Sequence, residues 1–243
     1  MDCHELIALV LKKEGVEWIA CFPNNPLIEA VAKEGIRPIT FRHERGAVMA
    51  ADGFSRTSDR QRFGIAVIQS QAGAENALGG IAQSFADNVP ILVLPGGVSL
   101  AEIDVRPNYS ATRNYPGVVK RVEAIYRPDQ VLPVMRRAFS ALRNGVAGPV
   151  VVELTSDVCS RESVNDIAEY APPKMMRQVP SALDISDAAR ALLEAKRPLL
   201  WAGAGVLFAG ATDELRSLAE LTGTPVFCTM PGKSAIDERH PLA

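Results

Sequence analysis

The sequence predicts an α/β protein whose first domain is a doubly wound parallel sheet flanked by helices. Strand-like and helix-like segments alternate over residues 1–154, which is typical of βαβ crossovers in a parallel sheet. The predicted strands are apolar throughout rather than alternating, as expected when helices cover both faces of the sheet. Polar turns follow several of these strands, at the edge where open α/β sheets bind their ligands.

Composition allows one large domain and part of another, and it argues against several classes of partner. The chain has 243 residues, of which 47% are hydrophobic and 22% charged. A net charge of −2 and a pI near 6.0 give no attraction to nucleic acid or anionic lipid. No apolar run approaches the roughly 18–20 residues of a membrane span, and the N-terminus lacks the basic start of a signal peptide. We therefore expect a cytoplasmic protein with no nucleic-acid or membrane partner.

Four scattered cysteines without a CxxC pair predict reduced thiols and no zinc site. The three histidines form no metal-binding set, so no metal ligand is expected in this chain. No Gly-x-Ser-x-Gly elbow is present, and catalytic-triad chemistry has no support. We interpret His43 as a structural residue and Asp52 as a solvated or helix-packing residue.

The first elements follow from hydrophobic spacing and from the residues that end each segment. The predicted helix 3–14 has apolar side chains at helical spacing between Glu and Lys, and a glycine closes it. The apolar run 16–22 predicts a buried strand, which Pro23 breaks. A helix over 26–34 follows, and Gly35 ends it.

The second strand leads directly into the stretch that matters most for function. The apolar run 36–41 predicts a strand, and a helix begins near Glu44. That helix carries small residues at helical spacing, which indicates close packing against a neighbour. The further predicted elements are a strand at 63–68, a helix through 77–85, a strand at 90–95, a helix at 128–142 and a strand at 149–154.

Two long polar stretches divide the rest of the chain. Residues 96–127 have weak periodicity, which predicts a long loop of the kind that is functional or lies at an interface. The proline-containing stretch 160–182 predicts an interdomain linker. We expect a first domain at 1–170, a linker at 171–184 and a truncated, Rossmann-like second domain at 185–243. Its predicted elements are a helix at 186–195, a strand at 198–203, a helix at 210–222 and a strand at 225–228.

Three polar clusters lie at the ends of predicted strands and should share one edge of the sheet. They are Pro23-Asn24-Asn25, Glu44, and the turn 69–76. A carboxylate beside two turns rich in backbone groups predicts a crevice for a small molecule. The alternative is that Glu44 only interacts with the free amides at the start of its helix, and that the turn only relieves backbone strain. On spacing alone this alternative is favoured.

The stretch 41–56 closely resembles the segment around the catalytic glutamate in thiamine-diphosphate enzymes of the acetohydroxyacid synthase type. The turn 69–77 lies where that family has a Ser-Gly-Pro-Gly-Ala-Thr-Asn run. Further similarity to the family's first and middle domains is found at 85–90, 148–154, 197–205 and 232–242. By itself, Gly203-Ala204-Gly205 is a weak dinucleotide fingerprint, because the next glycine, Gly210, is misplaced.

The resemblance implies a pyrimidine-binding domain followed by the start of a middle domain. It implies that Glu44 is catalytic and exchanges a proton with the cofactor's aminopyrimidine. The Gly-Asp-Gly motif that holds Mg²⁺ and the diphosphate is absent here, so we expect this chain alone to be inactive. The implied cofactor-binding residues are Phe22, Pro23, Asn24, Glu44, Ser70, Gly73 and Asn76.

The resemblance also implies a substrate and partners. The substrate would be a 2-oxo acid, converted by carboligation or decarboxylation. The partner would be the diphosphate-binding domain of a second subunit, in a homodimer or homotetramer. The family's Tyr-Pro-Gly-Gly turn and Gly-Pro-Gly run are replaced here by 22–25 and 71–73, and its Phe-Gln-Glu stretch is not visible, which leaves the substrate and FAD binding open. The alternatives are a non-catalytic nucleotide-binding or interaction module, and one half of a two-chain enzyme.

Overall fold

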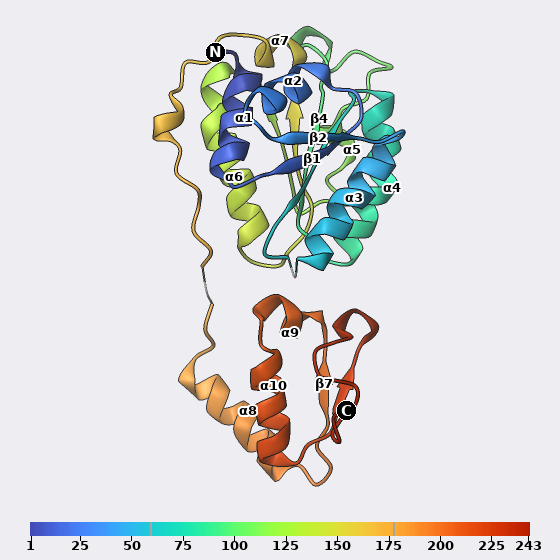
Figure 1. Ribbon diagram of the computed structural model, residues 1–243, viewed down its shortest axis with the longest axis vertical. Coiled ribbons are helices and arrows are strands. Elements are labelled where there is room, and N and C mark those ends of the chain that lie inside the picture. Colours follow the sequence, from blue (N-terminus) through green and yellow to red (C-terminus); the bar gives the residue numbers. More distant parts are fainter. Residues whose placement is uncertain (59, 177) are drawn as a thin grey trace. The chain divides into compact units, whose positions relative to one another are not determined.

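The computed structural model describes residues 1–58, 60–176 and 178–243 (Figure 1). The chain divides into two compact units, of which the first runs from Met1 to Met176 and the second comprises the remainder to Ala243. Tyr170 belongs to the first unit, because its ring is buried and its backbone carbonyl accepts a hydrogen bond from Lys13 Nζ at 3.1 Å. The domain limits and the linker at 171–184 stay predictions.

The first unit contains a six-stranded parallel sheet, which confirms the predicted fold class. The strand order is β2-β1-β3-β4-β6-β5, and every pair in it is parallel. The chain runs outward from β1 to β2 and then returns past β1 to β3. The order of the strands therefore reverses between β1 and β3. The strands are β1 Trp18–Cys21, β2 Arg37–Thr40, β3 Gly64–Ile68, β4 Ile91–Pro95, β5 Arg121–Ile125 and β6 Val150–Leu154.

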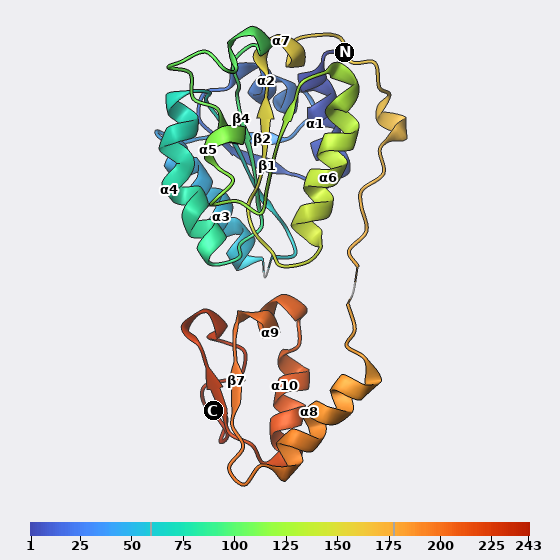
Figure 2. The ribbon, with the colours of Figure 1, turned by 180° about the vertical axis from the view of Figure 1, so that it is seen from behind.

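Helices cover both faces of the sheet, as the uniformly apolar strands predicted. The helices α1, α2 and α6 bury one set of apolar side chains against the sheet, and α3 and α4 bury a second set on the other face (Figures 1 and 2). The central strands β3, β4 and β6 are buried along their whole length. The helices are α1 Cys3–Lys13, α2 Asn25–Lys33, α3 Glu44–Thr57, α4 Ala72–Ala86, α5 Ala111–Asn114, α6 Val131–Arg143 and α7 Ser156–Cys159.

Helices α3 and α4 pack closely because small residues and a polar network lie between them. A Cβ built on Gly80 would lie 3.0 Å from Val48 Cγ1, so a larger residue there would require Val48 to shift. Asp52 is 8% exposed, and it accepts hydrogen bonds from Ser84 Oγ at 2.7 Å and from Arg56 Nε at 2.5 Å. The helix-packing interpretation of Asp52 is confirmed, and this pair of helices fixes how α3 presents Glu44 to α4.

The prediction of one loop over 96–127 is wrong, because this stretch contains the short helix α5 and the strand β5. β5 is an edge strand that pairs with β6, with Ile125 opposite Leu154. Its outer residues are charged, and Glu123 accepts hydrogen bonds from Arg121 Nε at 2.5 Å and Arg137 Nε at 3.0 Å. An edge strand needs only one buried face, so β5 lacks the apolar run that identified the other strands.

The described part of the second unit has a two-stranded parallel sheet and three α-helices. A helix after Gly203 was not predicted; Gly203 is its N-cap, directly after β7, and Gly205 lies in its first turn. With six residues, it is too short to give a periodic signal. The elements are α8 Ala182–Glu194, β7 Leu200–Ala202, α9 Ala204–Ala209, α10 Thr212–Thr222 and β8 Val226–Cys228.

Helix length and the state of the thiols are two further features of the described residues. No helix among them is both long and apolar enough to cross a bilayer. The four cysteines are free thiols, and those at positions 3, 21 and 159 are buried. Burial raises the pKa of the Cys3 thiol to about 11, with a further contribution from the nearby Asp2 carboxylate, so Cys3 stays protonated at neutral pH.

Candidate functional site

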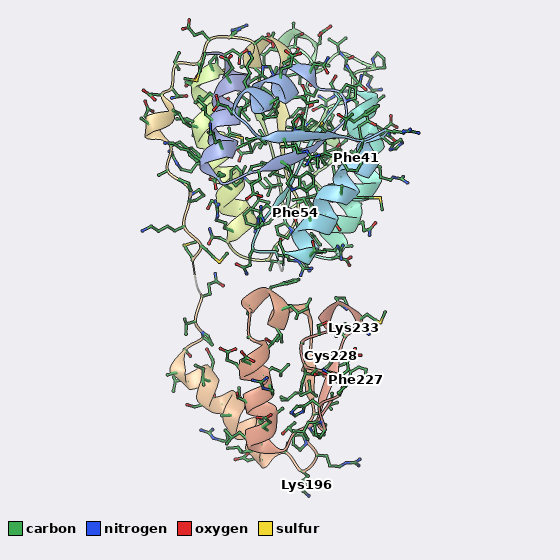
Figure 3. All side chains as sticks on the ribbon, in the orientation of Figure 1. Phe41, Phe54, Lys196, Phe227, Cys228 and Lys233 are labelled. Carbon is green, nitrogen blue, oxygen red and sulfur yellow. The ribbon has the colours of Figure 1, made fainter. Side chains whose placement is uncertain are left out.

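Glu44 stands at the junction between β2 and α3. After β2 ends at Thr40, the amide of Phe41 donates to the Cys21 carbonyl at 2.8 Å and extends the pairing with β1. His43 is the N-cap of α3, and its Nδ1 accepts a hydrogen bond from the Arg45 amide at 3.2 Å. Figure 3 labels Phe41 at the end of β2 and Phe54 farther along α3. The sequence thus delivers Glu44 to the carboxyl edge of the sheet, as predicted.

The Glu44 carboxylate is buried and lies against the first turn of α4. Only 4% of Glu44 is exposed, and its Oε2 accepts a hydrogen bond from Asn76 Nδ2 at 2.8 Å. A Cβ built on Gly73 would lie 2.7 Å from Glu44 Oε1. Any side chain at position 73 would therefore displace the carboxylate, and only glycine lets the two helices approach this closely. Glu44 and Gly73, which were both predicted as site residues, therefore lie in direct contact.

A tight turn joins this feature to the end of β3. The amide of Gly73 donates to the Ser70 carbonyl at 3.1 Å, which closes a four-residue turn, and α4 begins at Ala72. Asn76 then lies one turn into the helix, with Nδ2 2.8 Å from His43 Nε2 as well as from Glu44. The predicted residues Ser70, Gly73 and Asn76 therefore belong to one βα turn that faces Glu44.

The ends of β1, β3 and β4 meet beside that turn. Asn24 Nδ2 donates to the Ile68 carbonyl at 3.3 Å. A Cβ built on Gly96 would lie 3.3 Å from the Ser70 nitrogen and 3.6 Å from Asn24 Nδ2. β1 and β3 are also the strands between which the chain order reverses. Ligands of doubly wound sheets bind in the crevice at this topological switch point.

The structure joins five of the seven predicted residues and leaves two at the rim. Asn24, Glu44, Ser70, Gly73 and Asn76 form the connected group described above. Phe22 is half-buried, and its amide donates to the Val67 carbonyl at 3.0 Å. Pro23 is exposed. These two shape the turn after β1 and have no described hydrogen bond to Glu44.

Three residues that border the site were not among the predicted site residues. His43 contacts Asn76 through its ring, and Gly96 lies beside Ser70. Gln71 occupies the turn with a positive φ of 58°. A signal existed only for Gln71, because it stands where the related enzymes have glycine. The contacts of His43 and Gly96 depend on residues far away in the sequence.

The site is open toward the protein surface. Arg42, His43, Arg45 and Ala72 are exposed around the buried carboxylate. A cavity of about 580 Å³ lies beside Arg45, Ala72 and Asn76. Among the residues that the structure describes, no group of three His, Cys, Asp or Glu side chains could hold a metal ion. The arrangement offers a buried carboxylate and exposed turns to a small organic ligand.

Comparison with known proteins assigns this fold and site to a family. A model described as "Thiamine pyrophosphate enzyme, N-terminal TPP binding domain" matches residues 1–123, and one described as "Thiamine pyrophosphate enzyme, central domain" matches residues 185–243. The chain belongs to the thiamine pyrophosphate (thiamine diphosphate) enzyme family. The predicted family is confirmed.

Individual relatives show which members of that family the chain is similar to. A probable acetolactate synthase large subunit of Methanocaldococcus jannaschii is 35% identical over the whole chain, and an acetolactate synthase large subunit of Lactococcus lactis is 30% identical over 98% of it. A glyoxylate carboligase of Escherichia coli O157:H7 is 31% identical over 96% of the chain. The chain spans about 42%, 42% and 40% of the lengths of these three relatives.

Proposed function

We propose that this chain supplies the pyrimidine-binding half of a thiamine diphosphate site in an enzyme that acts on 2-oxo acids by carboligation or decarboxylation. The observation that carries the proposal is the buried Glu44 carboxylate, whose Oε1 lies in the space that a side chain at Gly73 would fill. This pair stands at the switch point of the sheet, where such folds bind ligands. The acetolactate synthases and the glyoxylate carboligase among the relatives support the substrate class.

The residues present fit the aminopyrimidine of that cofactor. A flat heterocycle with ring nitrogens needs a carboxyl group at one edge and closely approachable backbone around it. Glu44 provides the carboxyl group, and Gly73 and Gly96 provide backbone without side chains. Asn24 and Ser70 lie beside Gly96 and would border the ring. When bound, thiamine diphosphate supplies the electron sink for chemistry at the carbonyl carbon of the substrate.

The two oxygens of Glu44 have different tasks in this proposal. Oε2 is held by Asn76 Nδ2, which fixes the orientation of the carboxylate. Oε1 has no hydrogen bond among the described residues and is available to a ring nitrogen of the ligand. Burial keeps water from competing for a proton that is exchanged between Oε1 and the ligand. Glu44 thus acts as the proton relay, and Asn76 as the residue that orients it.

The other half of the site would come from a second subunit. The exposure of Pro23, Arg42 and His43 leaves one side of the Glu44 site open to a partner. We propose that a diphosphate-binding domain covers this side and holds Mg²⁺ with the diphosphate, in a cytoplasmic homodimer or homotetramer.

Replacement of Glu44 by glutamine in the full-length gene product tests the proposal. Gln keeps the shape and an oxygen that can accept from Asn76, but it cannot relay a proton. We expect thiamine diphosphate to bind with nearly unchanged affinity while turnover of pyruvate or glyoxylate falls by about 10²–10⁴-fold. Glu29→Gln, an equal change at an exposed position on α2, is the control and should keep full activity.

Two outcomes would overturn this function. Near-normal turnover by Glu44→Gln would remove the relay role. Failure of the unmodified protein to bind thiamine diphosphate in the presence of Mg²⁺ would favour the non-catalytic module instead. If the cofactor binds only after a separately encoded diphosphate-binding chain is added, the two-chain alternative holds.

A further inference from the structure

Gln71 has a backbone conformation that glycine normally takes. Its φ is 58° and its ψ is −118°. The hydrogen bond from the Gly73 amide to the Ser70 carbonyl makes Gln71 the second residue of the turn. These angles match the second position of a type II′ turn, where glycine is preferred because a Cβ is strained. Such strain persists in a protein only when surrounding contacts hold the residue in place.

Two hydrogen bonds hold the Gln71 side chain, and they use both ends of its amide. Nε2 donates to Asn108 Oδ1 at 2.9 Å, and Oε1 accepts from the Tyr109 amide at 2.9 Å. Asn108 is itself fixed, since its Nδ2 donates to the Glu102 carbonyl at 3.1 Å. An alanine or a glycine at position 71 could make neither side-chain bond. The strained residue is therefore the one that links the turn to residues 102–109.

The segment that Gln71 holds is anchored at its beginning. We name residues 98–110 the strap. Just before the strap, the Gly96 amide donates to the Ile68 carbonyl at 3.0 Å, at the end of β3. Within it, the Leu100 amide donates to Asp157 Oδ1 at 3.1 Å. The strap thus starts at the carboxyl edge of the sheet, beside the Ser70 turn.

The far end of the strap is fixed by a second buried carboxylate. Glu153, which is 6% exposed, accepts from Ser110 Oγ at 3.0 Å and from the Ala111 and Thr112 amides, each at 3.1 Å. The Tyr115 hydroxyl then donates to the Ala74 carbonyl in the first turn of α4. We name residues 70–73 the cofactor turn. Between the two anchored ends of the strap, Gln71 is the side chain of the cofactor turn that binds it.

The strap carries a cation suited to an anionic substrate. Residues 104–107 are exposed, and Arg106 among them has no hydrogen bond or ion pair within the described chain. A 2-oxo acid is a carboxylate, and guanidinium is a good partner for that group. Gln71 connects this segment to the cofactor turn. Gly73, two residues after Gln71 in the same turn, lies against the Glu44 carboxylate. The strap therefore borders the crevice next to the cofactor turn.

We propose that Gln71 is a positioning residue that fixes the strap against the cofactor turn, and that the strap forms the wall that receives the carboxylate of the 2-oxo acid. This rests on the proposed function. Glu44 and Gly73 serve the pyrimidine, whereas Gln71 acts on substrate binding through the strap. The two roles separate in experiment, because cofactor activation can be measured without substrate.

Two variants of the full-length protein distinguish the side-chain bonds from the backbone strain. Gln71→Gly loses both hydrogen bonds and suits the backbone, whereas Gln71→Ala loses both bonds and keeps a Cβ. For both we expect faster hydrogen–deuterium exchange in residues 98–110 and an increase of about tenfold in the KM for pyruvate, with kcat changing much less. Gln71→Glu keeps an acceptor for the Tyr109 amide and should restore part of the pyruvate affinity. Gln71→Ala should unfold at lower temperature than Gln71→Gly.

Cofactor measurements separate this inference from the proposed function. In Gln71→Gly, thiamine diphosphate affinity and exchange of the cofactor's C2 proton in deuterated buffer, without pyruvate, should stay within about threefold of the unmodified protein. Unchanged exchange in residues 98–110 would overturn the positioning role of Gln71. Faster exchange there with an unchanged KM would overturn the substrate wall. An unmodified protein that binds no cofactor would overturn the proposed function, and the substrate wall with it.

Discussion

Gly73 is the position where one added methyl group should do the most to the site. A Cβ there would lie 2.5 Å from Gln69 Cβ and 2.7 Å from Glu44 Oε1, and both distances are well inside van der Waals contact. Gln69 Cβ is held by the backbone and cannot move away easily. The Glu44 carboxylate can move, but then it loses the hydrogen bond from Asn76 Nδ2. Gly73→Ala should therefore strain the turn and displace the carboxylate together.

The expected loss of stability in Gly73→Ala combines these two effects with one opposing gain. Overpacking costs about 1–3 kcal/mol, and loss of a hydrogen bond to a charged group costs about 1.5–3 kcal/mol. Alanine in place of glycine within a helix returns about 0.5–1 kcal/mol. We expect the free energy of unfolding of the first unit to fall by roughly 1.5–5.5 kcal/mol.

Urea unfolding followed by tryptophan fluorescence can measure this change in the first unit alone. The chain has two tryptophans, and Trp201 is exposed in the second unit. A Trp201→Phe background leaves Trp18 as the reporter, whose ring lies 5.2 Å from that of Phe54 in the first unit. With a slope of about 2 kcal/mol per molar urea, the midpoint should fall by about 1 M or more.

Gly53→Ala is the matched control for this change. Gly53 lies within α3, and a Cβ built there meets nothing within 4 Å. This variant should gain about 0.5–1 kcal/mol from helix propensity alone. If Gly73→Ala matched Gly53→Ala in stability and kept its affinity for thiamine diphosphate, the close approach of Gly73 and Glu44 would have no energetic consequence, and the site geometry described here would be refuted.

Two further predictions concern groups that support the site or titrate near neutral pH. Glu153→Gln replaces one carboxylate oxygen with an amide N–H₂, so either the Ala111 amide or the Thr112 amide loses its acceptor. The first unit should lose about 1–3 kcal/mol of stability and exchange amides faster at 110–112, and unchanged exchange would contradict this. Burial lowers the pKa of His4 from its ordinary 6.5, although Asp2 opposes the shift. The unfolded chain therefore binds a proton at His4 more readily than the folded protein does. The contribution of His4 to stability is complete above about pH 6.5 and falls as the pH drops below that value. The urea midpoint should fall between pH 7.5 and 5.5, and less so in His4→Gln; an equal fall in both would exclude His4 as the cause.

Local patterns were sufficient to predict most of the fold and the position of Glu44. The strands are apolar runs and the helices have clear spacing, so the βα alternation alone placed Glu44 and the turn 69–76 at one edge of the sheet. β5 was not predicted, because Arg121 and Glu123 belong to an edge strand with one polar side. α9 was not predicted, because a helix of six residues is too short to show a periodic pattern of apolar residues.

The parts of the site that could not be predicted depend on contacts between distant residues. Gln71 meets Asn108 across 37 positions, and Glu153 meets Ala111 across 42. No spacing rule connects such pairs, because loop closure brings them together only after the sheet has formed. The family resemblance marked Gln71 as a departure from glycine, but it indicated no contact partner for Gln71, since Asn108 lies in a stretch without the family's pattern.

The surroundings of Glu44 favour one of its two interpretations, which turnover and stability measurements can test. A carboxylate that only served the start of α3 would bond to the amides of that helix, yet its described hydrogen bond comes from Asn76 on α4. No Lys or Arg among the described residues forms an ion pair with Glu44, although it is only 4% exposed. Burial of an unpaired charge opposes folding, so its presence is better explained by chemistry than by stability. Glu44→Gln should then keep or raise the urea midpoint of the first unit while turnover falls, and a loss of stability above about 1 kcal/mol would instead assign the carboxylate to the fold.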